Sequence, residues 1–200
     1  MGIQQKEVLA ITTRIFTLLN IFGMLLLQLH YLGLEGQGKI AWINSSIVIF
    51  TQYSQWVGGG AVAFLLAKET KSNLLPPAFI WVMIGGILFF SGVNLIQDSP
   101  FTYLQWLMIV FLCMQQAIFT VFQNMLLGRN KTQAYHLTIL VQTTSTLLLT
   151  WLFLWISPEI YSVLMALTLS FSTTFFLCAF LTRKEWFPLK WKEWMQTMKT

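Results

Sequence analysis

The fold is decided by residues 8–67, which read VLAITTRIFTLLNIFGMLLLQLHYL (8–32), GLEGQGK (33–39) and IAWINSSIVIFTQYSQWVGGGAVAFLLA (40–67). The first and third segments are apolar runs long enough for a helix to cross the hydrocarbon core of a bilayer, which takes about 20 residues. The three glycines of the middle segment interrupt the helical pattern. This stretch therefore predicts two membrane-spanning helices, packed antiparallel across a short connection.

Four further apolar runs follow, at 76–97, 101–127, 135–156 and 160–182. Prolines separate them, because Pro76-Pro77 opens the first of these runs, and Asp98-Ser99-Pro100 and Ser157-Pro158 make tight turns. The sequence predicts an all-α membrane protein in which residues 1–182 form a bundle of six transmembrane helices.

The composition excludes several classes of protein. Hydrophobic residues make up 56% of the chain, charged residues 10%, and the mean hydropathy is +0.66. Soluble domains carry about 25% charged residues, so a water-soluble enzyme, a disordered chain and a nucleic-acid-binding protein are excluded. Cys113 and Cys178 lie inside apolar runs and suggest core residues. We find no set of residues typical of catalysis, a metal site or a cofactor site, and expect no enzyme.

The charges predict the orientation. If the N-terminus is cytoplasmic, every lysine and arginine except Lys39 lies on the inner side, and the outer side carries Glu35, Asp98 and Glu159. Short loops with this bias follow the positive-inside rule. We expect a multi-pass protein of the inner (plasma) membrane with both termini in the cytoplasm, in contact with membrane lipids.

Residues 183–200 differ in character from the spans. Aromatic residues and methionines recur there at helical spacing among lysines, which is typical of a helix lying on the inner membrane surface. We interpret the segment as a basic, Trp-rich cytoplasmic linker. The alternative is that it begins a further span.

Polar residues form one stripe on each of four predicted spans. Polar groups in hydrocarbon are costly unless they have partners. The stripes therefore indicate either hydrogen bonds between helices or a shared, hydrated interior. Their members are Thr13, Arg14, Thr17, Asn20 and Gln28; Asn44, Thr51, Gln55, Gly58 and Gly59; Gln105, Gln116, Thr120 and Gln123; and Thr138, Gln142, Ser145 and Thr146.

Arg14 is the one strong charge inside a predicted span. It can act as an anchor that reaches the inner interface, as an anion-binding group, or as a partner for another helix. All seven aspartates and glutamates lie outside the spans, whereas ion-coupled transporters commonly carry one within them. An interior of Arg, Gln, Asn and Thr suits sugars and a phosphate.

Four segments carry a family resemblance. The loop YLGLEGQG (31–38) resembles the "LGPEGYG" loop of polysaccharide and O-antigen flippases, with Leu34 in the place of the usual proline. Residues 58–68, small residues that end in Ala-Lys, resemble the end of that family's second helix. LLGRNK (126–131) resembles the turn after its fourth helix, and TRIF (13–16) is similar to the start of the first helix in the peptidoglycan-precursor branch.

The resemblance implies an exporter in which two six-helix lobes face each other across a cavity. Alternating access would move a lipid-linked oligosaccharide, on a polyprenyl pyrophosphate, across the membrane. Arg14 would meet the phosphate, and the sugar path would be lined by Asn20, Asn44, Gln55, Gln116 and Gln123. Family members carry twelve to fourteen spans, so the chain is expected to be the N-terminal lobe of a longer protein or to work as a dimer.

Two other functions compete with this interpretation. One is a multidrug or metabolite extruder of the same superfamily, which would need an intramembrane acid elsewhere. The other is a membrane scaffold or subunit that transports nothing, in which the polar stripes are only packing surfaces.

Overall fold

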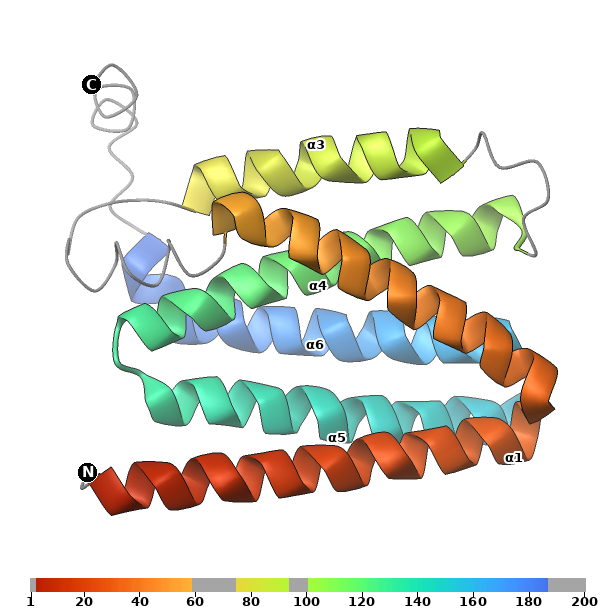
Figure 1. Ribbon diagram of the computed structural model, residues 1–200, viewed down its shortest axis with the longest axis horizontal. Coiled ribbons are helices and arrows are strands. Elements are labelled where there is room, and N and C mark those ends of the chain that lie inside the picture. Colours follow the sequence, from red (N-terminus) through yellow and green to blue (C-terminus); the bar gives the residue numbers. More distant parts are fainter. Residues whose placement is uncertain (1–2, 59–74, 94–100, 187–200) are drawn as a thin grey trace.

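The computed structural model describes residues 3–58, 75–93 and 101–186, and this part of the chain is helical with no strand (Figure 1). The expected all-α fold is confirmed. The helices are α1 (Ile3–Gly58), α3 (Leu75–Val93), α4 (Tyr103–Gly128), α5 (Thr132–Ile156) and α6 (Ile160–Trp186). The predicted residues 59–67 of the second span, the turn at 98–100 and residues 187–200 lie outside the described residues.

Helix α1 turns back on itself at Gly33, so that residues 3–32 (the first arm) and 34–58 (the second arm) diverge from one end of the bundle (Figure 1). Gly33 has φ 67° and ψ −170°, a conformation essentially restricted to glycine. Helical structure resumes directly after it, and the expected seven-residue interruption at 33–39 is therefore wrong. One glycine reverses the chain, while Gly36 stays helical and packs so closely that an added Cβ would lie 2.5 Å from Leu32 Cβ.

The two arms pack against different helices. The first arm lies along α5, where a Cβ added to Gly23 would be 3.5 Å from a methyl carbon of Leu147. The second arm lies along α3 and α4, and the Tyr53 ring stacks on Trp81 with 4.9 Å between ring centroids. Because the arms share only the Gly33 end, they form the two sides of a wedge (Figure 1).

A repeat of small side chains brings α5 and α6 together. Every fourth residue of α6 is small and buried, from Ser162 through Ala166, Ser170, Thr174 and Cys178 to Thr182. Small residues at this spacing let two helices approach closely in a membrane. The stripe meets the threonines of α5, and the hydroxyls of Ser170 and Thr146 are 2.7 Å apart.

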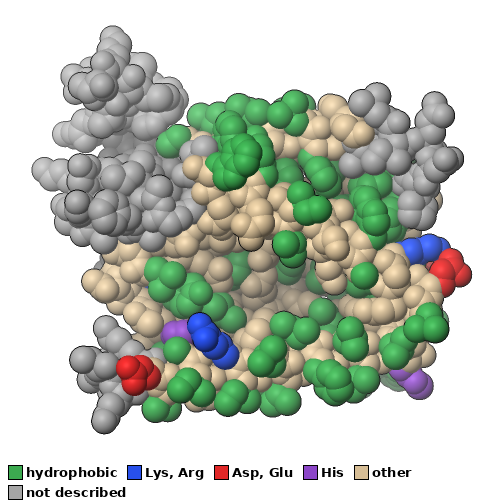
Figure 2. All heavy atoms as spheres, in the orientation of Figure 1, with side chains coloured by type: hydrophobic (Ala, Val, Ile, Leu, Met, Phe, Trp, Pro, Cys, Tyr) green, Lys and Arg blue, Asp and Glu red, His purple; other side chains and the backbone are tan. Residues whose placement is uncertain are grey.

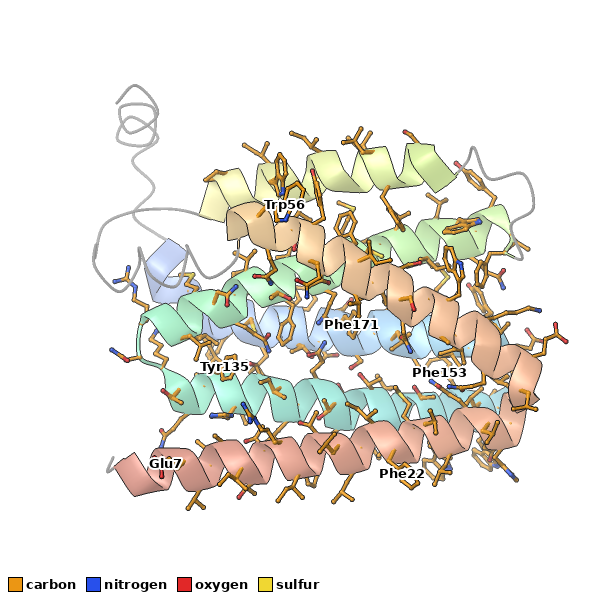
Figure 3. All side chains as sticks on the ribbon, in the orientation of Figure 1. Glu7, Phe22, Trp56, Tyr135, Phe153 and Phe171 are labelled. Atoms are coloured by element: carbon orange, nitrogen blue, oxygen red, sulfur yellow. The ribbon has the colours of Figure 1, made fainter. Side chains whose placement is uncertain are left out.

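The apolar core lies between the second arm, α3, α4 and α6, where Ile40, Ile43, Val82, Ile109 and Leu164 are completely buried. Large apolar residues also cover the outside, such as Phe22, whose side chain points away from the bundle (Figure 3). A bundle that is apolar both in its core and on its outer surface is typical of a protein that lies in lipid.

Within the described residues, four helices are long and apolar enough to cross a membrane: Glu7–Trp56, Tyr103–Gly128, Thr132–Ile156 and Ile160–Arg183. Pro77–Phe89 of α3 is a shorter apolar helix. The structure thus supports association with a membrane. A count of six spans and the orientation of the termini stay predictions.

We predict that Gly33→Ala destabilises the protein, because a side chain at this φ and ψ costs about 1–3 kcal/mol. Gly38→Ala is the matched control, since Gly38 is helical, exposed and has nothing within 4 Å of an added Cβ. Thermal unfolding in detergent should show a lower Tm for Gly33→Ala and an unchanged or higher Tm for Gly38→Ala. Equal midpoints would contradict the role assigned to Gly33.

Candidate functional site

A layer of uncharged polar side chains crosses the bundle near the middle of its long helices. We call it the central polar layer. It links the first arm of α1 with α4, α5 and α6 through hydrogen bonds between helices, and it consists of Asn20, Gln115, Gln116, Gln142, Thr143, Thr144, Ser145, Thr146, Ser170 and Ser172.

Three amides join the helices of this layer. The Gln142 Nε2 group donates to Gln116 Oε1 at 2.7 Å and connects α5 with α4. The Gln115 Nε2 group donates to Ser172 Oγ at 2.8 Å and connects α4 with α6. The Asn20 Nδ2 group reaches the hydroxyl oxygens of both Thr143 and Thr144 at 3.3 Å, so the first arm is held to α5 by longer hydrogen bonds.

Ser170 connects α6 to three groups of α5. Its hydroxyl is 2.6 Å from the hydroxyl of Ser145 and 2.7 Å from that of Thr146, and it donates to the carbonyl of Gln142 at 3.1 Å. The side chain of Gln142 thus binds α4 while its carbonyl binds α6. Gln142 is the residue through which three helices are connected.

A second amide pair lies farther from Gly33. The Asn124 Nδ2 group of α4 donates to Gln55 Oε1 of the second arm at 3.3 Å. Nearby, the indole nitrogen of Trp81 in α3 donates to the carbonyl of Tyr53 at 3.3 Å. Both contacts tie the second arm to the side of the bundle opposite the first arm.

The six predicted substrate-binding residues differ in exposure and in hydrogen bonding. Asn20 is buried, Gln55, Gln116 and Gln123 are half-buried, and Arg14 and Asn44 are exposed. Asn20, Gln55 and Gln116 bind neighbouring helices, but no hydrogen bond joins any two of the six within the described ranges. The alternative that the polar stripes only bond helix to helix therefore accounts for the hydrogen bonds of Asn20, Gln55 and Gln116. A role of the six residues in binding a ligand stays a prediction.

The surface in Figure 2 is hollowed between the two arms of α1. Backbone and uncharged polar atoms dominate this hollow, while apolar side chains dominate its flanks (Figure 2). Figure 3 shows Phe171 of α6 between the arms in this view, and its side chain is buried in the apolar core. The wedge made by Gly33 thus opens a polar region on one face of an apolar bundle.

The charged side chains are unevenly distributed between the ends of the bundle. Arg129, Lys131 and Arg183 lie at the end where α4 and α6 finish, together with the N-terminus (Figure 1). At the Gly33 end Lys39 is the only lysine or arginine among the described residues, and its Nζ is 2.8 Å from Glu35 Oε1. Arg14 lies in the N-terminal half of the first arm, near His136 of α5.

Exposed tyrosines and tryptophans gather at the Gly33 end. Tyr103 begins α4, Trp151 and Trp155 lie in the last turns of α5, and Tyr161 lies at the start of α6; all four are exposed. Such rings favour the boundary between lipid and water. All four residues lie near the ends of predicted spans, so their position is a signal that can be seen in the sequence.

The polar stripes predicted from the sequence lack five members of the central polar layer, Gln115, Thr143, Thr144, Ser170 and Ser172, and they lack Asn124 of the second amide pair. The four-residue spacing of small residues in α6 was a signal that could have identified Ser170. Gln115 bonds to α6 and Gln116 bonds to α5. No pattern within one helix predicts which neighbouring helix each of these amides reaches.

Comparisons of the chain with protein-family models found no match. Comparisons with curated protein sequences and with solved structures found none either.

We predict that Gln116→Leu and Gln142→Leu each destabilise the protein, because each leaves the other amide without its partner. The double substitution should cost less than the sum of the two single ones, by about 0.6 kcal/mol or more, the mean for hydrogen bonds between membrane helices. A double-mutant cycle on the free energy of unfolding in detergent measures this coupling. Strictly additive effects would contradict the bond between these amides.

Proposed function

We propose that the chain forms one lobe of a flippase that moves a lipid-linked oligosaccharide from the inner to the outer leaflet by alternating access. The observation that carries the proposal is the central polar layer, which places uncharged and in part only half-buried amides and hydroxyls inside an apolar bundle. Neutral groups of this kind both donate and accept hydrogen bonds, as sugar hydroxyls require.

The partly exposed amides supply the proposed sugar path. Gln116 and Gln123 lie seven residues apart on α4 and therefore on one face of that helix. Both are half-buried, so they keep surface available to a ligand. Arg14 is exposed on the first arm, and its guanidinium suits the pyrophosphate of a polyprenyl carrier because it can bind two oxygens at once.

The two ends of the bundle support the proposed orientation. In this topology the two arms of α1, together with α3, α4, α5 and α6, are six spans, and both termini are cytoplasmic. Arg129, Lys131 and Arg183 then face the cytoplasm, where positive residues accumulate, and the exposed rings at the Gly33 end lie at the outer interface.

A second lobe completes the proposed exporter, either in the same polypeptide or as another copy. Transporters of this kind bind their substrate between two lobes near the middle of the bilayer. The central polar layer lies near the middle of its helices, at the depth where such a site is expected.

A membrane scaffold is the second candidate, because Asn20, Gln55 and Gln116 are already bound to neighbouring helices. The two functions differ in whether water reaches the hollow.

Cysteine accessibility separates the flippase from the scaffold. In a background without Cys113 and Cys178, Gln123→Cys should react with a small charged thiol reagent, since the proposed path is hydrated. Leu112→Cys, which is completely buried, and Leu19→Cys, which is exposed on the outside of the first arm, are the controls and should stay unreactive. Protection of Gln123→Cys equal to that of Leu112→Cys supports the scaffold.

Arg14→Ala should abolish surface polysaccharide in cells that depend on this protein, with its abundance in the membrane unchanged, because the phosphate loses its cation. Arg14→Lys should retain part of the export. Arg183→Ala is the control, since the Arg183 guanidinium lies 4.3 Å from the centre of the Phe180 ring and is not part of the proposed path. Normal export by Arg14→Ala would remove Arg14 from the mechanism.

A further inference from the structure

Several of the described side chains carry buried polar atoms without a hydrogen-bond partner, among them Gln28 and Thr150. The Nε2 group of Gln28, in the first arm, has no hydrogen-bond partner in the described structure, and neither has the hydroxyl of Thr150, in α5. Gln28 is 2% exposed and Thr150 is completely buried. A buried polar atom that stays unpaired costs about 1–3 kcal/mol, so a partner is expected at each of them.

Thr150 differs from most of the threonines of the bundle, although the hydroxyl of Thr17 in the first arm is also buried without a partner in the described structure. The hydroxyls of Thr13, Thr120, Thr143, Thr146 and Thr174 each donate to the carbonyl four residues earlier in their own helix. This local bond satisfies a threonine hydroxyl inside a membrane helix. Thr150 makes no such bond in the described structure, and its hydroxyl is therefore free for another partner.

The packing of the first arm on α5 places Gln28 and Thr150 at nearly the same depth. Asn20 bonds to Thr143 and Thr144, and Gly23 faces Leu147. Continued along both parallel helices, this register brings Gln28 to within about one helical turn of Thr150. Both lie toward the Gly33 end, which is the closed end of the wedge (Figure 1).

A third group at this end extends the set. The Oε1 atom of Gln37, four residues beyond Gly33 in the second arm, is also buried without a partner in the described structure. The three groups provide an amide donor, an amide acceptor and a hydroxyl that does both. None carries a charge, so these groups would not neutralise the charge of a bound ion, whereas an uncharged ligand needs no such neutralisation.

We propose that the closed end of the wedge is a binding site for uncharged hydroxyl groups, formed by Gln28, Thr150 and Gln37. The hydroxyls come either from bound water or from the sugar of the carried molecule, and the second source rests on the proposed function. Buried polar atoms without protein partners are the usual binding points of interior water, and sugar hydroxyls offer the same donors and acceptors.

The sign of a stability change tests the site. Thr150→Val keeps the shape of the side chain and removes the hydroxyl. If a hydroxyl-bearing partner is bound, the variant loses that bond, and Tm in dodecylphosphocholine should fall by about 2–4 °C. If the Thr150 hydroxyl has no partner, its removal relieves the free-energy cost of burying an unpaired polar group and raises Tm. Gln28→Leu should change Tm in the same direction as Thr150→Val.

Two matched variants keep the test decisive. Thr173→Val removes an exposed hydroxyl of α6 and should leave Tm almost unchanged. Thr150→Ser keeps the hydroxyl without the methyl group, so it should retain the response to ligand described below even if it is less stable. A rise in Tm for Thr150→Val and Gln28→Leu, or no change beyond that of Thr173→Val, overturns the proposal.

Addition of octyl glucoside to the same micelles distinguishes the two sources. If the site takes sugar hydroxyls, the glucoside raises Tm of the parent protein and of Thr150→Ser more than that of Thr150→Val. If it takes water, the glucoside shifts all three equally while Thr150→Val remains less stable. Either outcome supports the site. The site can hold water even if Arg14→Ala exports normally and the proposed flippase function is thereby contradicted. This site and the proposed flippase can therefore fail independently.

Discussion

The structure depends on the need to satisfy uncharged polar groups inside an apolar bundle. Gln142 meets this need for three helices at once, because its amide binds Gln116 of α4 and its carbonyl accepts from Ser170 of α6. Water is absent from the core of a bilayer, and each polar group there must find a partner in the protein or in a hydrated cavity. The central polar layer consequently fixes which helices are neighbours and at what depth they meet.

Gly33 turns this layer into a candidate site. By reversing α1 within one residue it directs the first arm to α5 and the second arm to α3 and α4, and the hollow lies between the arms (Figures 1 and 2). The uncharged central polar layer, together with the exposed Arg14 of the first arm, suits the proposed ligand that carries both sugars and a phosphate. The apolar exterior suits the lipid part of the same ligand.

Much of the fold could be predicted from the sequence, because hydropathy and helix-breaking residues are local signals. Helix α5 ends at Ile156, as predicted, and begins at Thr132, three residues before the predicted start. The interruption at 33–39 was predicted too long because the pattern shows that a turn occurs but not that one glycine suffices. The partners of Gln115, Gln116 and Ser170 could not be predicted, since they depend on the rotation of each helix against its neighbours.

If the protein is a flippase lobe, water and a polar ligand reach the hollow between the arms of α1 while the protein is in a bilayer. Electron paramagnetic resonance of a nitroxide at position 123 measures this most directly, through its collision rates with a polar nickel chelate and with oxygen. We expect the nickel chelate to relax this label far more than a label at position 19, whose side chain is exposed on the first arm. Equal preference of both labels for oxygen would show a lipid-like environment and contradict the account.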